Sequence, residues 1–245
     1  MKTTVLTVLA VVFLMGSTFS QSNSKIPLIG SKAPSFTAQS TSGELNFPND
    51  FGKSWKILFS HPQDFTPVCS SELLELAHLQ SDFDKLGVKI AIISTDNMEQ
   101  HEMWVSHLEE IDYMGRGTQK INFPVIDDQK KTASKQYGML HEPVSTNKDI
   151  RGVFIIDPNN TVRSVNFYPM EVGRNMNEIV RLVEALQTVD KSKVLTPANW
   201  ENGQDVMVPY FPYTKEQLAA NPELKDEFYT MGNRMWFKKV ENNRE

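Results

Sequence analysis

The stretch SHPQDFTPVCSSEL, residues 60–73, contains the only cysteine of the 245-residue chain, Cys69. One cysteine cannot form a disulfide within its own chain, so this thiol is buried and inert, paired with another chain, or reactive. Thr66 lies three residues earlier and offers a hydroxyl that can donate to an oxygen beside the sulfur. Pro62 and Pro67 restrict the backbone of the loop. These residue types predict a nucleophilic thiolate with a hydrogen-bond donor close to it.

The sequence around Cys69 predicts that it lies in the first turn of a helix. Residues 55–60 (WKILFS) form an apolar run typical of a buried strand. From residue 67 to residue 85 apolar residues recur at helical spacing, and a proline suits the first helical position. Backbone N–H groups and the positive end of the helix favour a thiolate there. The position favours a reactive cysteine, while an ordinary small apolar residue at a helix start remains the alternative.

Strands and helices alternate along the chain from about residue 26. The predicted strands are 88–94, 123–127, 151–156 and 161–167, and the further predicted helices are 97–111, 131–137 and 175–187. The segment DPNN, residues 157–160, predicts the turn of a hairpin. Past residue 190 prolines and aromatic residues are frequent and show little regular period, so we expect a boundary there. The pattern predicts an α/β sandwich with a mixed sheet.

The N-terminus has the composition of a secretory signal. Lys2 precedes an apolar run, residues 5–15, which is too short to cross a bilayer core of about 30 Å comfortably. Small residues follow up to Ser20, where we expect cleavage. A buried N-terminal helix is the alternative. Residues 1–20 are thus predicted to direct export, and the mature protein is expected to be secreted.

The charge pattern argues against two classes of partner. The formal net charge is -5 and both signs are spread along the chain. No basic block is present, so nucleic-acid binding is not expected. No apolar run after the N-terminal one approaches membrane length, so no stable membrane insertion is expected.

The spacing of Pro62, Thr66 and Cys69 is that of the peroxiredoxin active-site signature, and the longer string resembles the one-cysteine peroxiredoxins of the peroxiredoxin-six subfamily. Similar blocks recur downstream: FPVIDD (123–128), YGML (137–140), RGVFIIDP (151–158), YPMEVGRNMNEI (168–179) and TPANWENGQDVMV (196–208). The resemblance runs from about residue 26 to residue 208. It implies a thioredoxin-like α/β fold, with a central mixed sheet flanked by helices, over residues 26–190. It also implies a smaller C-terminal domain over residues 191–245 that helps to form a homodimer.

The resemblance implies a thiol-specific peroxidase that reduces hydrogen peroxide and organic or lipid hydroperoxides without a cofactor. Cys69 would attack the O–O bond and become a sulfenic acid. Thr66 would contact the peroxide oxygens, and Arg151 matches the arginine that stabilises the thiolate and the developing negative charge. Because no second cysteine can resolve the sulfenic acid, the reductant must be external: a small thiol, ascorbate or a partner redox protein.

Four residues are expected to support this site. Pro62 stiffens the loop, and Glu72, one helical turn after the cysteine, could orient the arginine. Arg174 matches a second arginine near the family's site. His61 matches a histidine typical of the subfamily and could donate a proton or form a wall of the peroxide pocket. Each charged residue could equally have a surface, capping or structural role.

Competing functions are less consistent with these residues. A secreted scaffold or holdase would not need Thr66, Cys69 and Arg151, and a disulfide oxidoreductase would need a C-x-x-C pair. Phospholipid hydrolysis, known for some members of the subfamily, would use a Gly-x-Ser-x-Gly serine with a histidine and an aspartate. Here the stretch is GKSWK (52–56), and the partner positions fall on Pro48 and Asn159. A serine without its base is a weak nucleophile, so no lipase is predicted.

Two further patterns in the sequence concern metal binding and glycosylation. His101 and His107 lie six residues apart in a predicted helix, which is not the four-residue spacing of a metal-binding pair, so we expect both to be solvated. No metal site is predicted. The tripeptide Asn159-Asn160-Thr161 is a glycosylation sequon in a predicted exposed turn.

Overall fold

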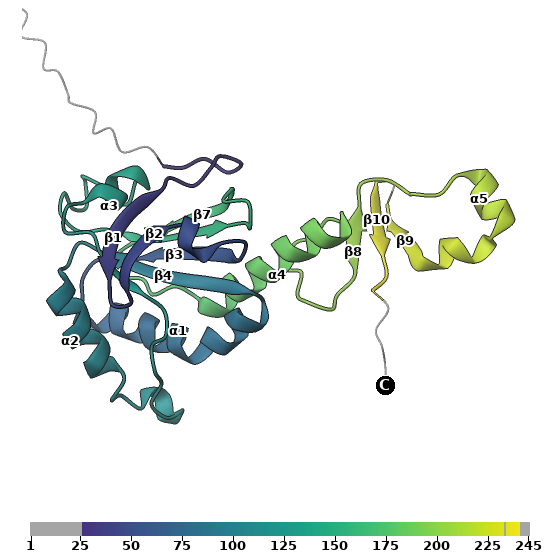
Figure 1. Cartoon of the computed structure of the whole chain (residues 1–245). Coiled ribbons are helices and arrows are strands. Elements are labelled where there is room, and N and C mark those ends of the chain that lie inside the picture. Colours follow the sequence, from purple (N-terminus) through teal and green to yellow (C-terminus); the bar gives the residue numbers. More distant parts are fainter. Residues whose placement is uncertain (1–25, 233, 241–245) are drawn as a thin grey trace, which may run out of the picture.

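The structure is a computed structural model that describes residues 26–232 and 234–240. Its main part is a seven-stranded sheet with the order β2-β1-β5-β4-β3-β6-β7 (Figure 1). Its strands are β1 (Phe36–Ser40), β2 (Gly43–Phe47), β3 (Trp55–Ser60), β4 (Val88–Ser94), β5 (Val125–Asp127), β6 (Arg151–Ile156) and β7 (Val162–Tyr168). The pairs β3–β4 and β4–β5 are parallel and the others antiparallel. The sheet is therefore mixed, as expected. The predicted signal segment lies outside the described residues.

Helices cover both faces of this sheet. They are α1 (Pro67–Lys85), α2 (Met98–Leu108), α3 (Thr132–Gln136) and α4 (Met176–Ser192). Buried residues of α1, α2 and α4 share one apolar cluster with the central strands. Residues of α3 and of the β1–β2 hairpin form a second cluster against the opposite face. The result is a three-layer sandwich.

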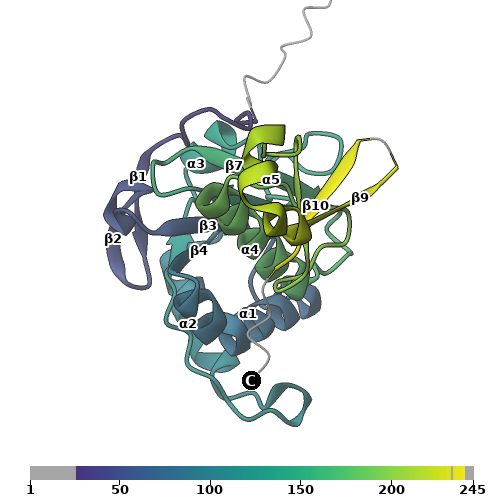
Figure 2. The same cartoon turned by 90° about the vertical axis from the view of Figure 1, so that its right-hand side faces the viewer.

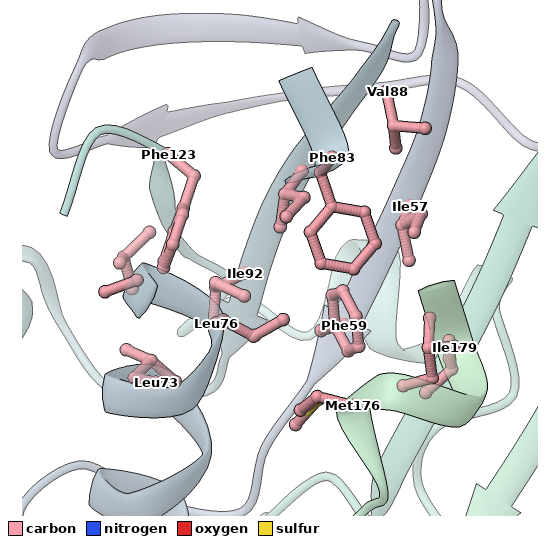
Figure 3. Packing of buried hydrophobic residues seen from close by; sticks show 14 of the residues in the cluster. Ile57, Phe59, Leu73, Leu76, Phe83, Val88, Ile92, Phe123, Met176 and Ile179 are labelled. Carbon is pink, nitrogen blue, oxygen red and sulfur yellow. The ribbon is translucent and has the colours of Figure 1, made fainter. Parts of the chain in front are cut away.

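The central strand β3 shows why the sheet is buried on both sides. All six of its residues are buried, and successive side chains point to opposite faces. Ile57 and Phe59 pack into the cluster with α1 and α4, whereas Leu58 packs into the other cluster. Figure 3 shows Phe59 near Leu76 of α1 and Met176 of α4, with Ile57 near Phe83 of α1. This packing fixes the end of β3, from which the loop to Cys69 starts.

A second, smaller sheet follows α4. It contains β8 (Val206–Val208), β9 (Phe228–Met231) and β10 (Met235–Lys238) in the order β8-β10-β9, and α5 (Lys215–Ala220) lies between β8 and β9. Figure 1 shows this C-terminal module at the far end of α4, projecting from the sandwich, and in Figure 2 the module faces the viewer in front of the sandwich. The sequence predicted little regular structure past residue 190, but the segment contains three short strands and a short helix. Strands of three and four residues are too short to give a visible period.

The element predictions differ from the structure mainly at their boundaries. The hairpin with its turn at residues 157–160 is confirmed as β6 and β7. Helix α4 runs to Ser192 and not to residue 187, because no proline or glycine interrupts it before Lys193, which adopts a left-handed conformation. The domain boundary near residue 190 stays a prediction. Among the described helices, none combines the length and apolar character needed to span a membrane.

Candidate active site

Cys69 lies in the first turn of α1 and is fully buried, with 0% of its surface exposed. Thr66 is the N-cap residue with extended backbone, Pro67 follows as the first helical residue, and the Thr66 carbonyl accepts a hydrogen bond from Ser70 N at 2.9 Å. Proline fits there because the first N–H groups of a helix have no partner within it. The prediction that Cys69 begins a helix after a strand and a proline-containing loop is confirmed.

Arg151 brings a guanidinium group to the sulfur. It is the first residue of β6, it is buried, and its Nη1 lies 3.3 Å from Cys69 Sγ. Its Nε and Nη2 donate to the Met170 carbonyl at 2.9 and 2.6 Å. Two donors on one carbonyl fix the plane of the guanidinium, which leaves Nη1 directed at the thiol. The two residues are 82 positions apart in the sequence and meet because β6 pairs with β3.

Glu72 connects Arg151 to Arg174. Its Oε2 accepts from Arg151 Nη1 and from Arg174 Nη2, both at 2.7 Å, and its Oε1 accepts from Arg174 Nε at 2.9 Å. Burial opposes ionisation of this carboxyl, but the charge and hydrogen bonds of Arg174, together with Arg151, outweigh it and hold the pKa of Glu72 below its ordinary value. The site is thus a buried carboxylate between two guanidinium groups.

Arg174 has further partners on the strands. Its Nη1 donates to the carbonyls of Ser60 and Gly152 at 2.9 and 2.8 Å, and its guanidinium lies 5.2 Å from the centre of the Phe59 ring. The guanidinium therefore joins β3, β6 and α1 at one point. Glu72, expected here from its spacing to Cys69, and Arg174, expected here from the family resemblance, both lie at the site.

The Thr66 side chain makes its hydrogen bond within the loop and not to the sulfur. Its hydroxyl donates to the Gln63 carbonyl at 2.9 Å and its side chain makes no cap hydrogen bond to the helix. This bond tightens the loop that carries Pro62, which is buried. The role of Thr66 towards a peroxide oxygen stays a prediction.

His61 is held by a buried carboxylate that the sequence analysis did not single out. Its Nε2 lies 2.7 Å from Asp64 Oδ1, and His101 Nδ1 lies 2.7 Å from Asp64 Oδ2. The His61 ring also packs at 5.0 Å from the ring of Trp104. Burial lowers the pKa of His61, although its hydrogen bond to Asp64 opposes the shift. His61, Asp64 and His101 therefore form a buried His–Asp–His cluster beside the loop.

The expectation that His101 is solvated is wrong. His101 is fully buried in α2, whereas His107 is exposed, as expected. A signal was present in the sequence, because His101, Trp104 and Leu108 recur at helical spacing and all three are buried. Periodicity that counts only apolar residues omits such a histidine.

The same cluster contains the candidate metal ligands among the described residues. One ligand atom from each of His61, Asp64 and Asp96 lies within 4.8 Å of the others. Both Asp64 oxygens already accept from imidazoles, and Asp96 Oδ1 accepts from Lys148 Nζ at 2.7 Å. Since hydrogen bonds and an ammonium group occupy these oxygens, the donors fit an ion-pair network better than a cation site.

Ser54, at the position of a lipase serine, lies at the opposite end of β3 from the loop that leads to Cys69. Ser54 directly precedes β3, and its backbone N–H donates to the Phe51 carbonyl at 3.2 Å in a turn. Asn159 occupies the exposed tip of the β6–β7 hairpin. An amide there cannot act as the acid of a triad. The geometry adds nothing in favour of hydrolysis.

Comparison with known proteins places this geometry in context. The sequence pattern of the AhpC/TSA family matches residues 29–165, and that of the C-terminal domain of 1-Cys peroxiredoxin matches residues 185–217. A peroxiredoxin of Methanosarcina mazei is 46% identical over 204 residues, which cover 82% of this chain and 93% of that protein.

Two solved structures are also similar. A cysteine-to-serine variant of the peroxiredoxin 6 of Arenicola marina has a TM-score of 0.76 and 31% identity, covering 88% of this chain and 99% of the other. The yeast mitochondrial 1-Cys peroxiredoxin has a TM-score of 0.74 and 35% identity, covering 88% of this chain and 100% of the other. The thiol of that yeast protein is resolved via glutathione and thioredoxin systems.

Proposed function

The chain belongs to the AhpC/TSA family and is a thiol-dependent peroxidase of the one-cysteine peroxiredoxin type, and we propose that Cys69 is its peroxidatic nucleophile. One observation carries this assignment: the single cysteine of the chain lies 3.3 Å from Arg151 Nη1, at the start of a helix. A guanidinium and a helix N-terminus both favour a thiolate over a thiol.

The proposed reaction has two halves. Cys69 Sγ attacks one peroxide oxygen, the O–O bond breaks, and the electron pair leaves on the second oxygen, which takes a proton and departs as water or an alcohol. Arg151 stabilises the negative charge as it moves from sulfur to the leaving oxygen. The sulfur is then a sulfenic acid. One external thiol condenses with it to give a mixed disulfide and water, and a second thiol releases reduced Cys69.

The proposed substrates are hydrogen peroxide and organic or lipid hydroperoxides. The reductant must come from outside the chain because Cys69 has no partner cysteine. The yeast relative is resolved by glutathione and thioredoxin systems, which supports a small thiol or a partner redox protein here. Ascorbate is the alternative, and a comparison of turnover with each reductant separates them.

The decisive experiment compares the purified protein with Cys69→Ser. With excess dithiothreitol the wild type should consume peroxide and the variant should not. With peroxide alone, the intact mass of the wild type should increase by one oxygen and then by two, as sulfenic acid proceeds to sulfinic acid. Equal turnover by the two proteins, with unmodified Cys69, would disprove the assignment.

A homodimer is proposed from the shape of the chain. The C-terminal module projects from the sandwich (Figure 1). Tyr210, Met231 and Met235 of this module have exposed apolar side chains. Exposed apolar residues on a projecting module suit an interface. Light scattering should give the mass of two chains, and truncation after residue 204 should give one.

Export is proposed from the sequence of residues 1–20. Expression of the full gene in a secreting eukaryotic host tests it. Protein recovered from the medium should begin near Gln21 by N-terminal sequencing, whereas protein retained in the cell with Met1 intact would contradict the proposal.

A further inference from the structure

The pairing of β3 with β6 stops just before the active site. The last paired residues are Phe59 and Val153, although Ser60 and Gly152 would be the next pair in this antiparallel register. At this point the fully buried side chain of Ser60, and not its backbone, is hydrogen-bonded to β6. Its hydroxyl donates to the Ile150 carbonyl at 2.6 Å and accepts from Gly152 N at 2.8 Å.

These two hydrogen bonds flank Arg151. The Ile150 carbonyl belongs to the peptide unit before Arg151, and the Gly152 N–H belongs to the peptide unit after it. One hydroxyl thus holds both peptide units, which fixes the backbone dihedral angles of Arg151 and with them the direction of its Cα–Cβ bond. The guanidinium that reaches Cys69 is held at its other end by Met170.

Gly152 leaves the space that this arrangement requires. A Cβ atom on Gly152 would lie 2.9 Å from Ser60 Oγ and 3.0 Å from Phe154 Cε2. Contacts that short do not occur without displacement of one partner. A side chain at position 152 would therefore push the hydroxyl away from the peptide units beside Arg151.

Arg174 joins Ser60 and Gly152 by hydrogen bonds to their backbone carbonyls. Its Nη1 donates to both the Ser60 and the Gly152 carbonyls, where the ladder between the strands has ended. The Ser60 hydroxyl and the Arg174 guanidinium together replace the missing ladder bonds. The strand ends are thereby set by side chains, at the place where Arg151 leaves β6.

We propose that Ser60 is a positioning residue for peroxide reduction, acting through the backbone of Arg151. This inference rests on the proposed role of Arg151 as the group that stabilises the thiolate and the leaving oxygen. Without the hydroxyl, the buried Ile150 carbonyl and Gly152 N–H lose their partners, and the strand start shifts to find others. Nη1 then no longer points at the sulfur, and the thiolate loses its donor.

The test uses Ser60→Ala, Arg151→Ala and the double variant, in full-length mature protein. The second-order rate of peroxide reduction is measured together with the pH dependence of the thiolate ultraviolet absorbance, in which Cys69 is the only contributing thiol; the same titration of Cys69→Ser gives the background from tyrosine. Tyr137→Phe is the matched control: it also removes a buried hydroxyl that donates to a backbone carbonyl, that of Pro34, in the other apolar cluster.

Ser60→Ala should lower the peroxide rate on the order of 10- to 100-fold, as a small misplacement of a reacting group does. It should also reduce the fraction of thiolate at a given pH, which a loss of stability alone would not do. In the Arg151→Ala background the same change should alter the rate by no more than about 2-fold, because its target is gone. Tyr137→Phe should lower stability and leave the rate unchanged.

Three results would overturn the proposal. They are a wild-type rate for Ser60→Ala, the same fold-loss with and without Arg151, and a thiolate titration that Ser60→Ala leaves in place. If Ser60→Ala does not fold, Gly152→Ala replaces it in all comparisons. The added methyl group displaces the Ser60 hydroxyl from the two peptide units beside Arg151. A wild-type rate for Arg151→Ala would identify the role of Arg151 itself as the error, and a loss for that variant alone would confine the error to Ser60.

Discussion

Arg174 binds both oxygens of the Glu72 carboxylate, through Nε at 2.9 Å to Oε1 and Nη2 at 2.7 Å to Oε2. Its own backbone N–H adds a third bond to Oε1 at 2.8 Å. Paired, nearly parallel bonds of this kind give a carboxylate a fixed orientation. Arg174 therefore fixes the orientation of the Glu72 carboxylate. Glu72 in turn holds the guanidinium of Arg151, which lies beside the sulfur.

Glu72→Gln should damage stability and catalysis together. Removing the charge leaves two buried guanidinium groups without their shared anion, so the free energy of unfolding should fall by about 3 kcal/mol. Peroxide reduction should slow because Arg151 loses one of its anchors. Urea unfolding and stopped-flow peroxide consumption measure the two effects. Glu75→Gln on the same helix is a control, since Glu75 pairs with Arg116 at a partly exposed position and contacts neither Arg151 nor Arg174 through a hydrogen bond. Unchanged stability of Glu72→Gln would contradict this account.

Arg151→Lys should lower the second-order rate with peroxide by roughly 100- to 1000-fold, the cost of losing a donor that faces developing charge. A lysine ammonium keeps the charge but cannot span Met170, Glu72 and Cys69 at once, as the planar fork does. Alkylation of Cys69 by iodoacetamide should slow less than peroxide reduction, because only the peroxide reaction needs a stabilised leaving oxygen. Equal losses in the two reactions would show that Arg151 acts on the thiolate alone.

Asp64 should make the protein sensitive to acid. Burial opposes its ionisation, but the hydrogen bonds from His101 and His61 outweigh this and hold the pKa of Asp64 at about 2. A carboxyl with a depressed pKa stabilises the fold above its unfolded pKa of about 4, and that contribution disappears as pH falls through about 2. The contribution of this group is about 2 kcal/mol.

Asp64→Asn should therefore be less stable than the wild type at pH 7, and the difference should shrink as pH approaches 2. Urea unfolding across this range measures it. Asp84→Asn, an exposed carboxyl on α1, provides the comparison. A stability difference that does not change with pH would show that Asp64 contributes through packing only.

Asp149 should make the protein less stable at high pH, whereas Asp64 makes it less stable at low pH. It is fully buried, and burial, with repulsion from Asp128 and Asp96, raises the pKa of Asp149 to about 8. Ser134 Oγ lies closer to Asp128 Oδ2, at 2.6 Å, than to Asp149 Oδ2, at 3.1 Å, so its single proton goes to Asp128. A protonated Asp149 can then donate to Ser134, which fits a neutral acid.

For Asp149 the folded state holds a proton that the unfolded chain releases above about pH 4. The stability contributed by the neutral carboxyl is full below that pH and is lost as pH rises through about 8. Asp149→Asn, which keeps a donor for Ser134, should be more stable than the wild type at pH 8 by about 2–4 kcal/mol, and equal to it near pH 4. Thermal unfolding at the two pH values tests this, and an asparagine variant less stable at both would contradict it.

The sequence predicted the parts of the site that depend on local order. A strand, a proline-containing loop and a helix start are each visible within a few residues, so Cys69 at the start of α1 could be derived from residues 55–85. Glu72 could also be derived from its position one helical turn after Cys69. Arg151 and Arg174 were expected only from the family resemblance, because spacing alone cannot show that residues 82 and 102 positions apart meet. Their meeting depends on the strand order, which local patterns do not determine.

The residues that sequence analysis missed are buried polar ones. Asp64, Asp149 and His101 have types that are usually exposed, so composition and periodicity do not identify them as buried. Each is buried because its partner lies on a different element, as Asp64 bonds His101 from 37 positions away. Ser60 ends the predicted buried strand, but its role beside Arg151 leaves no sign in the sequence. The strands β1 and β2 were also missed, since GELNF and FTAQS mix polar and apolar residues at a sheet edge.

Helix α4 belongs to two apolar clusters at once. Met176 and Ile179 pack into the cluster under the active site, and Ala185 packs with Trp200 of the C-terminal module. The helix begins two residues after Arg174 and, with 17 residues, is about 26 Å long. One continuous helix therefore connects the C-terminal module to the loop that carries Arg174. We expect a contact that shifts the module to change the position of the guanidinium that orients Glu72.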